Sequence, residues 1–171
     1  MSKQIKTINL TPFLPEKHRE ILEKWLYRTH VYQWWIHPEN NLQQALNLSS
    51  DNHAIIVADD VSVGYIRWQK VNQEELNLVG IKTIPDGSVD IDIFIGEVDY
   101  LGCGIGPIVL KILVDKLLKD LTIPVIIMST SVNNHFAIKA YQKAGFNCMF
   151  QFDSPTYGRC WIMGLEPAIA D

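Results

Sequence analysis

One stretch of the chain, residues 88–106, joins an alternating strand pattern to a glycine-rich turn. Apolar β-branched residues fall on one face of the predicted strand and comprise Val89, Ile91, Ile93 and Ile95. The opposite face carries Ser88, Asp90, Asp92 and Phe94. We therefore expect a strand that buries an apolar stripe and presents two carboxylates on its other face.

The turn that follows contains Gly102, Gly104 and Gly106 and leads into an apolar segment of helix length. Glycines expose backbone N–H groups, and a helix N-terminus adds partial positive charge, so this turn is suited to bind a phosphate group. It is not a P-loop, because no Lys-Ser/Thr pair follows the last glycine, and its spacing differs from the Rossmann fingerprint. A flexible turn between strand and helix is the alternative.

The remaining pattern predicts a mixed α/β fold. Strands are expected over residues 3–10, 53–58, 63–71, 88–95, 122–130, 146–152 and 157–165. Helices are expected over residues 15–28, 42–48, 105–119 and 133–145. The polar stretch 72–87 reads as a loop. This order indicates a central, largely antiparallel twisted sheet of about seven strands, flanked by about four helices, in one domain spanning residues 1–171.

Composition narrows the class of protein. The chain has 171 residues, 47% of them hydrophobic, which is enough for one domain with a core. A net charge of -4 gives no nucleic-acid signature. The first residues lead into no apolar run, and no apolar run reaches membrane-spanning length, so neither a secretory signal nor a membrane span is expected.

Cysteines and histidines give no metal signature. Cys103, Cys148 and Cys160 are odd in number and lack C-x-x-C spacing, which argues against a zinc site or a disulfide framework. The five histidines show no ligand spacing either. We expect a reduced, cytoplasmic protein without a metal.

Two motifs resemble the GNAT superfamily of acetyl-CoA-dependent N-acetyltransferases. Leu101–Gly106 is similar to the family's pyrophosphate loop, Arg/Gln-x-x-Gly-x-Gly/Ala, except that Leu101 replaces the first residue. Residues 134–146 are similar to its second signature, N-x-x-A-x-x-x-Y-x-K-x-G-F, at every specified position. The resemblance extends to the aminoglycoside 6'-N-acetyltransferase branch through the W-L-x-R-x-H-x-x-x-W-W segment of residues 25–35 and the Gly64-Tyr65 pair. Ser129-Thr130 departs from the Asp-Pro common in that branch.

The resemblance implies roles for particular residues. Asp92 would be the catalytic base, Tyr141 the acid that protonates the leaving thiolate, and Asp90 a binder of the ammonium form. Residues that would bind acetyl-CoA are Ile93, Phe94, Ile95, Cys103, Gly104, Ile105, Gly106, Asn134, Ala137 and Lys143. Residues that would bind the acceptor are Trp34, Trp35, Tyr65, Asp90 and Asp92. A β-bulge in residues 93–95 would open space for the thioester.

Each role has a simpler alternative. The aspartates fit an ordinary polar strand face, Tyr141 a core anchor, Asn134 a helix N-cap, and the two tryptophans the base of a loop. The partners implied are acetyl-CoA and a small amine, with the protein a monomer or homodimer. A peptide N-terminus or a siderophore-type amine is an alternative acceptor, and an acyl-CoA-binding domain without turnover is an alternative function.

Overall fold

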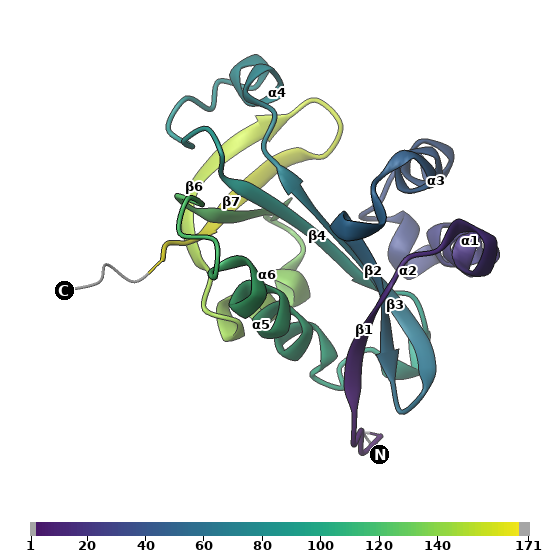
Figure 1. The fold of residues 1–171 in the computed structure, drawn as a ribbon. Helices are drawn as coiled ribbons and strands as arrows, with labels where there is room; N and C mark the ends of the chain where they lie inside the picture. Colours follow the sequence, from purple (N-terminus) through teal and green to yellow (C-terminus); the bar gives the residue numbers. More distant parts are fainter. Residues whose placement is uncertain (1–2, 168–171) are drawn as a thin grey trace. The chain divides into compact units, whose positions relative to one another are not determined.

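A computed structural model describes residues 3–167 of the protein (Figure 1). The strands are β1 (Ile8–Pro12), β2 (His53–Ala58), β3 (Val61–Lys70), β4 (Val89–Ile95), β5 (Ile126–Ser131), β6 (Asn147–Ser154) and β7 (Gly158–Leu165). The helices are α1 (Pro15–Leu26), α2 (Thr29–Tyr32), α3 (Pro38–Asn47), α4 (Gln73–Leu78), α5 (Ile105–Leu117) and α6 (His135–Lys143). Short 3₁₀ turns cover Ser50–Asn52 and Val98–Tyr100.

The strands form one seven-stranded sheet in the order β1-β2-β3-β4-β5-β7-β6. The pairs β1–β2, β2–β3, β5–β7 and β6–β7 are antiparallel, whereas β4 and β5 are parallel. This confirms the predicted mixed fold with a largely antiparallel sheet of about seven strands. Residues 3–167 contain six helices rather than about four, and the two additional ones are the short helices α2 and α4.

Contacts between residues divide the chain into two compact units. The N-terminal unit comprises Met1–Arg67 and Ile93–Val109, and the C-terminal unit comprises Trp68–Asp92 and Leu110–Asp171. Strands β3 and β4 and helix α5 each contribute residues to both units. The single domain predicted for residues 1–171 stays a prediction, and residues 1–2 and 168–171 lie outside the described residues.

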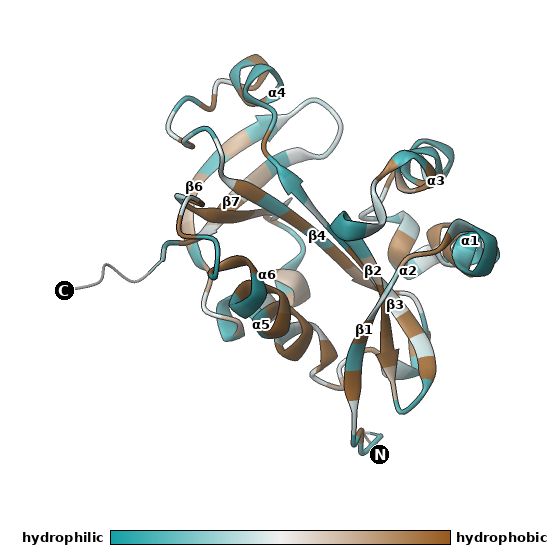
Figure 2. Ribbon diagram, viewed as in Figure 1, coloured by the Kyte–Doolittle hydropathy of each residue, from teal (hydrophilic) through white to brown (hydrophobic). Residues whose placement is uncertain are grey.

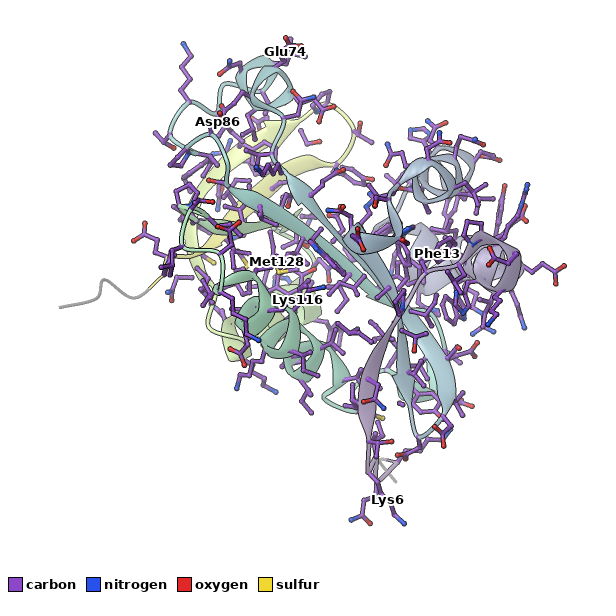
Figure 3. All side chains as sticks on the ribbon, in the orientation of Figure 1. Lys6, Phe13, Glu74, Asp86, Lys116 and Met128 are labelled. Carbon is purple, nitrogen blue, oxygen red and sulfur yellow. The ribbon has the colours of Figure 1, made fainter. Side chains whose placement is uncertain are left out.

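The N-terminal unit has an aromatic core built from its three helices and the strands beside them. Its buried members are Phe13, Leu22, Trp25, Leu26, Val31, Leu42, Ala45, Ile55, Tyr65 and Phe94. Leu22, Trp25 and Leu26 form the buried stripe of α1. The ring of Phe13, labelled in Figure 3, lies with its centroid 4.7 Å from that of His53, so a histidine is part of this core.

One buried cluster of the C-terminal unit is aliphatic. Its buried members are Ile81, Ile84, Val125, Ile127 and Ile162, and partly buried side chains such as Phe150 and Phe152 of β6 pack against them. The ammonium of Lys116, which is labelled in Figure 3, lies 5.2 Å from the ring centroid of Trp68 and makes a cation–π contact with it. Lys116 thus covers part of an indole ring that is itself buried.

Helix α5 is apolar over most of its length (Figure 2). Val109, Leu110 and Leu113 are fully buried, whereas Lys111 and Asp115 are exposed. None of the helices within residues 3–167 is long and apolar enough to cross a membrane.

Among the differences from the predicted elements, three have a local reason. The first strand begins at Ile8 rather than residue 3, because the Asp59 carboxylate accepts the N–H groups of residues 6 and 7. Helix α4 replaces part of the expected loop, because the Asn72 side chain caps it by accepting from the N–H groups of residues 74 and 75. Strand β5 begins at Ile126, after Pro124.

Candidate active site

The C-terminal unit brings together Asp90 and Asp92 of β4 and Tyr141 of α6. Both carboxylate residues are half-buried, and Tyr141 is 8% exposed. Burial raises the pKa of Tyr141 above its ordinary value of 10.0, and the negative charges of Asp92 and then Asp90 raise that pKa further. The phenol therefore keeps its proton at neutral pH and lies within electrostatic reach of both carboxylates.

Strands β4 and β5 separate next to these carboxylates. Among the described residues, the parallel register pairs only Val89 with Ile126 and Asp90 with Ile127. Strand β5 continues to Ser131 in pairing with β7. Asp92 therefore lies beyond the paired part of β4, where the strand edge toward β5 has no ladder.

The end of β4, in the N-terminal unit, carries the hydrogen-bond pattern of a β-bulge. The N–H groups of both Gly96 and Glu97 donate to the Val63 carbonyl of β3, at 2.8 and 3.1 Å. Two consecutive donors on one acceptor mean that two residues oppose one. This pattern lies one residue past Ile95, on the edge toward β3, and a bulge within residues 93–95 stays a prediction.

Phe94 occupies a different environment from the one that strand alternation predicted. It was expected on a polar face, but it is 8% exposed and its ring centroid lies 4.8 Å from that of Trp35 and 6.2 Å from that of Trp25. Ile93 and Ile95 are only half-buried. The face that carries aspartates at positions 90 and 92 becomes apolar at Phe94, because helices of the N-terminal unit cover it there.

The glycine turn is open. A Cβ atom built on Gly102, Gly104 or Gly106 would meet nothing within 4 Å. Gly102 and Gly104 have φ values of +71° and +76°, which side chains disfavour and which turn the backbone sharply before α5. The half-buried Cys103 thiol points to the carbonyls of residues 99 and 101, and Ile105 is buried in the first turn of α5. The turn has room for an anion at the helix N-terminus.

The predicted cofactor residues of α6 lie at both of its ends. The Asn134 carboxamide oxygen accepts the Ala137 N–H at 3.2 Å, so Asn134 is the N-cap of α6, the simpler reading of this residue. Ala137 is half-buried in the first turn, and Lys143 is exposed in the last. Capping uses the amide oxygen of Asn134. A role of Asn134 in binding acetyl-CoA stays a prediction.

The predicted acceptor residues outside β4 lie in the N-terminal unit. Tyr65 is 1% exposed, and its hydroxyl lies 2.9 Å from Nδ1 of the buried His53. The half-buried Trp35 packs edge-on against Tyr65, with ring centroids 6.2 Å apart, and the Arg67 guanidinium carbon lies 4.6 Å from its ring centroid. Trp34 is also half-buried. Trp35 and Tyr65 therefore belong to one aromatic cluster.

Sequence reasoning missed the contacts that residues 25–30 make with the end of β4. The motif in these residues was noted, but Glu97, which binds two of its side chains, gave no signal because it lies about seventy positions away. It also missed the burial of His53, which is 1% exposed. This histidine places a titratable ring inside the core.

Comparison with known proteins agrees with the fold and the motifs. The family described as acetyltransferase (GNAT) domain matches residues 14–154. The aminoglycoside acetyltransferase AAC(6')-Ib, in its complex with coenzyme A and kanamycin, is 26% identical, with a TM-score of 0.72 over 94% of this chain and 95% of that one. A complex of AAC(6')-Ib that contains acetyl-CoA is 24% identical, with a TM-score of 0.73 over 94% of each chain.

The aminoglycoside N(6')-acetyltransferase of Legionella pneumophila is similar at the level of the fold. It is 19% identical, with a TM-score of 0.73 over 93% of this chain and 91% of that one. The predicted likeness to this branch is thus confirmed. Since the family match covers well over half of the residues, the chain belongs to the GNAT acetyltransferase family, and the predicted class of acetyl-CoA-dependent acetyltransferase is confirmed.

Proposed function

We propose that the enzyme acetylates a primary amine of a small cationic acceptor, with an aminoglycoside modified at its 6'-amine as the leading candidate. The observation that carries this proposal is the group formed by Asp92, Asp90 and Tyr141, in which two carboxylates lie within electrostatic reach of a protonated phenol. An amine acetyltransferase needs one group that removes a proton and another that supplies one, and this group contains both.

The glycine turn fits the pyrophosphate of acetyl-CoA, because its backbone is open and precedes a helix N-terminus. The N–H groups of residues 103–106 would hold the pyrophosphate, and the backbone of Ile93–Ile95 would pair with the pantetheine arm as an added strand does. Asn134, Ala137 and Lys143 of α6 are further proposed contacts of acetyl-CoA. Acetyl-CoA supplies the acetyl group as a thioester.

Asp92 accepts the proton that the acceptor's ammonium must lose, either directly or through a water molecule. The free amine then forms the new N–C bond while the C–S bond breaks, and the second proton that the acetylated nitrogen loses replaces the one that Tyr141 gives to the sulfur. Asp90 contributes a second negative charge that favours the ammonium form during binding. Both charges suit a polyamine, and neither would favour an anionic acceptor.

Tyr141 donates its phenolic proton to the departing sulfur. Its raised pKa makes it a weak acid in the resting enzyme, since burial and then the charges of Asp92 and Asp90 hold the proton on the phenol. When Asp92 takes up the amine proton its charge disappears, and one cause of the raised pKa disappears with it. Proton uptake by the base thereby strengthens the acid at the stage when the sulfur needs a proton.

A second acceptor class is favoured by one observation in the N-terminal unit. The Arg67 guanidinium stacks on Trp35, so a positive charge accompanies a predicted acceptor-binding ring. A polycationic acceptor would be repelled there, whereas an amine that also carries a carboxylate, such as a peptide N-terminus, would not. A siderophore-type amine belongs with this alternative.

Location, resistance and assembly remain part of the proposal. With an aminoglycoside as acceptor, the enzyme would confer antibiotic resistance, acting in the cytoplasm predicted from its three free cysteines. It would act as a monomer or homodimer. The non-catalytic alternative, an acyl-CoA-binding domain, predicts coenzyme A binding without turnover.

The test is thiol release from acetyl-CoA with kanamycin, an uncharged primary amine and a short peptide as acceptors. Asp92→Asn should lower kcat/KM by roughly 100- to 10,000-fold, the usual contribution of a positioned base. Asp86→Asn, an exposed aspartate of the same unit, is the matched control and should leave kcat/KM unchanged.

Turnover with kanamycin that is lost in the Asp92 variant supports the aminoglycoside proposal. Turnover with the peptide alone moves the acceptor to the second class. Saturable coenzyme A binding without release of thiol for any amine refutes amine acetylation and supports the binding-domain alternative.

A further inference from the structure

Glu97, just beyond β4, is bound by the side chains of Trp25 in α1 and Arg28, the residue before α2. The Trp25 indole N–H donates to Glu97 Oε1 at 2.8 Å, and Arg28 Nη1 donates to Glu97 Oε2 at 2.8 Å. The same Arg28 nitrogen donates to the Gly96 carbonyl at 2.8 Å. The Trp25 hydrogen bond, followed by the hydrogen bond and charge of Arg28, lowers the pKa of Glu97, so charge-assisted bonds hold this segment at neutral pH.

His30 binds the backbone two residues earlier. Its Nε2 lies 3.0 Å from the Ile95 carbonyl, and because a carbonyl only accepts, this nitrogen carries the proton. The Gly96 N–H points toward β3, where it meets the Val63 carbonyl. Backbone groups of successive strand residues point to opposite edges, so the Ile95 carbonyl lies on the other edge, together with the backbone of Ile93.

These contacts lie beside the bulge at the end of β4. At the bulge, two N–H groups share one carbonyl, so the ladder with β3 fixes the chain less firmly than regular pairing would. Side chains of residues 25–30 take up the carbonyls of Ile95 and Gly96 and the carboxylate of Glu97. Side chains thereby hold the end of β4 in addition to its pairing with β3.

We propose that Trp25, Arg28 and His30, here called the β4 clamp, are positioning residues that hold Ile93–Ile95 in the geometry that binds the pantetheine arm. The inference rests on the proposed role of this backbone in cofactor binding. Preorganisation of a binding edge lowers the entropy lost on binding, so loosening the clamp weakens affinity without removing a contact to the ligand.

His30 offers the cleanest variants, because it is half-buried and its contact is a single hydrogen bond. His30→Ala should raise the KM for acetyl-CoA, and the Kd for coenzyme A measured by calorimetry, by roughly three- to tenfold, the usual value of one net hydrogen bond. His30→Gln carries an N–H donor at a similar reach and should restore both constants to within about twofold of wild type.

Glu97→Gln tests the other half of the clamp, because it removes the charge and places an amide against Arg28. The same two constants should rise by roughly tenfold. Tyr27→Phe is the matched control: Tyr27 lies in the same segment and donates to the Glu39 carboxylate at 2.7 Å, with no role in the clamp. It should leave both constants unchanged.

A lower Tm in His30→Ala and Glu97→Gln, with unchanged KM for acetyl-CoA and unchanged Kd for coenzyme A, would overturn the proposal and make the clamp purely structural. If Glu97→Gln fails to fold, the His30 pair decides. The calorimetric readout does not depend on an acceptor, so a wild type that binds coenzyme A but acetylates no amine would defeat the proposed function and leave this test intact.

Discussion

Acidification from pH 7 to pH 5 should destabilise the protein through one buried side chain, His53. This residue is 1% exposed, and its Nδ1 lies 2.9 Å from the Tyr65 hydroxyl. Its ring also bonds the Leu48 carbonyl, which requires a proton on the other nitrogen. Nδ1 of the neutral ring therefore accepts from Tyr65, and protonation would place a second proton where that donor already points.

The magnitude follows from the pKa of His53, which burial and then the charge of Arg67 lower from 6.5 to about 4. Between these two values the unfolded chain binds the proton and the folded chain does not, so stability falls as pH falls. At about 1.4 kcal/mol for each pH unit, the free energy of unfolding should drop by about 2 kcal/mol between pH 6.5 and pH 5.

Urea unfolding at pH 7, 6, 5.5 and 5 is the assay, for wild type and for His53→Gln, which cannot titrate. The difference in unfolding free energy between the two proteins should shrink by about 2 kcal/mol across the series. His18→Gln is the control. The pKa of the half-buried His18 is also lowered, chiefly by desolvation, but this variant keeps His53. It should therefore retain the loss of stability that is due to His53. A difference between wild type and His53→Gln that stays constant from pH 7 to pH 5 would refute the reasoning.

Two further changes test individual positions. Gly96→Ala should lower the free energy of unfolding by about 1–3 kcal/mol, measured by urea titration, because the added Cβ would lie 2.2 Å from Cγ of the fully buried Trp25; unchanged stability would show that the indole can move aside. Tyr141→Phe keeps the buried ring and loses the proton, so kcat should fall by roughly 100-fold at a nearly unchanged KM for acetyl-CoA, as judged by thiol release; an unchanged kcat would remove the proposed acid.

Local sequence patterns predicted much of the fold of this chain. The alternation around Asp90 and Asp92 located β4, because a strand imposes a fixed period of two on burial. The same logic failed at Phe94. Periodicity assigns a residue to a face, but it does not reveal which distant aromatic rings cover that face.

Side-chain contacts between residues far apart in the sequence could not be predicted, and they are the part of the site that sequence analysis missed. The contacts of Glu97 with Trp25 and Arg28 join positions 72 and 69 residues apart, and nothing near Glu97 in the sequence marks it. The cap that Asn72 supplies to α4 was visible in principle, since an asparagine precedes a run of helix-forming residues, but the polar composition of the stretch favoured a loop.

The close approach of Gly96 to Trp25 has a consequence for how related sequences can diverge. Because the glycine leaves no space for a Cβ beneath the indole, neither position can change freely while the other stays as it is. A smaller residue at position 25 would open room for a side chain at position 96. That change would lower the stability of the fold, because it removes the largest side chain in this core. Substitution at these two positions should therefore be correlated, with the tryptophan changing before the glycine.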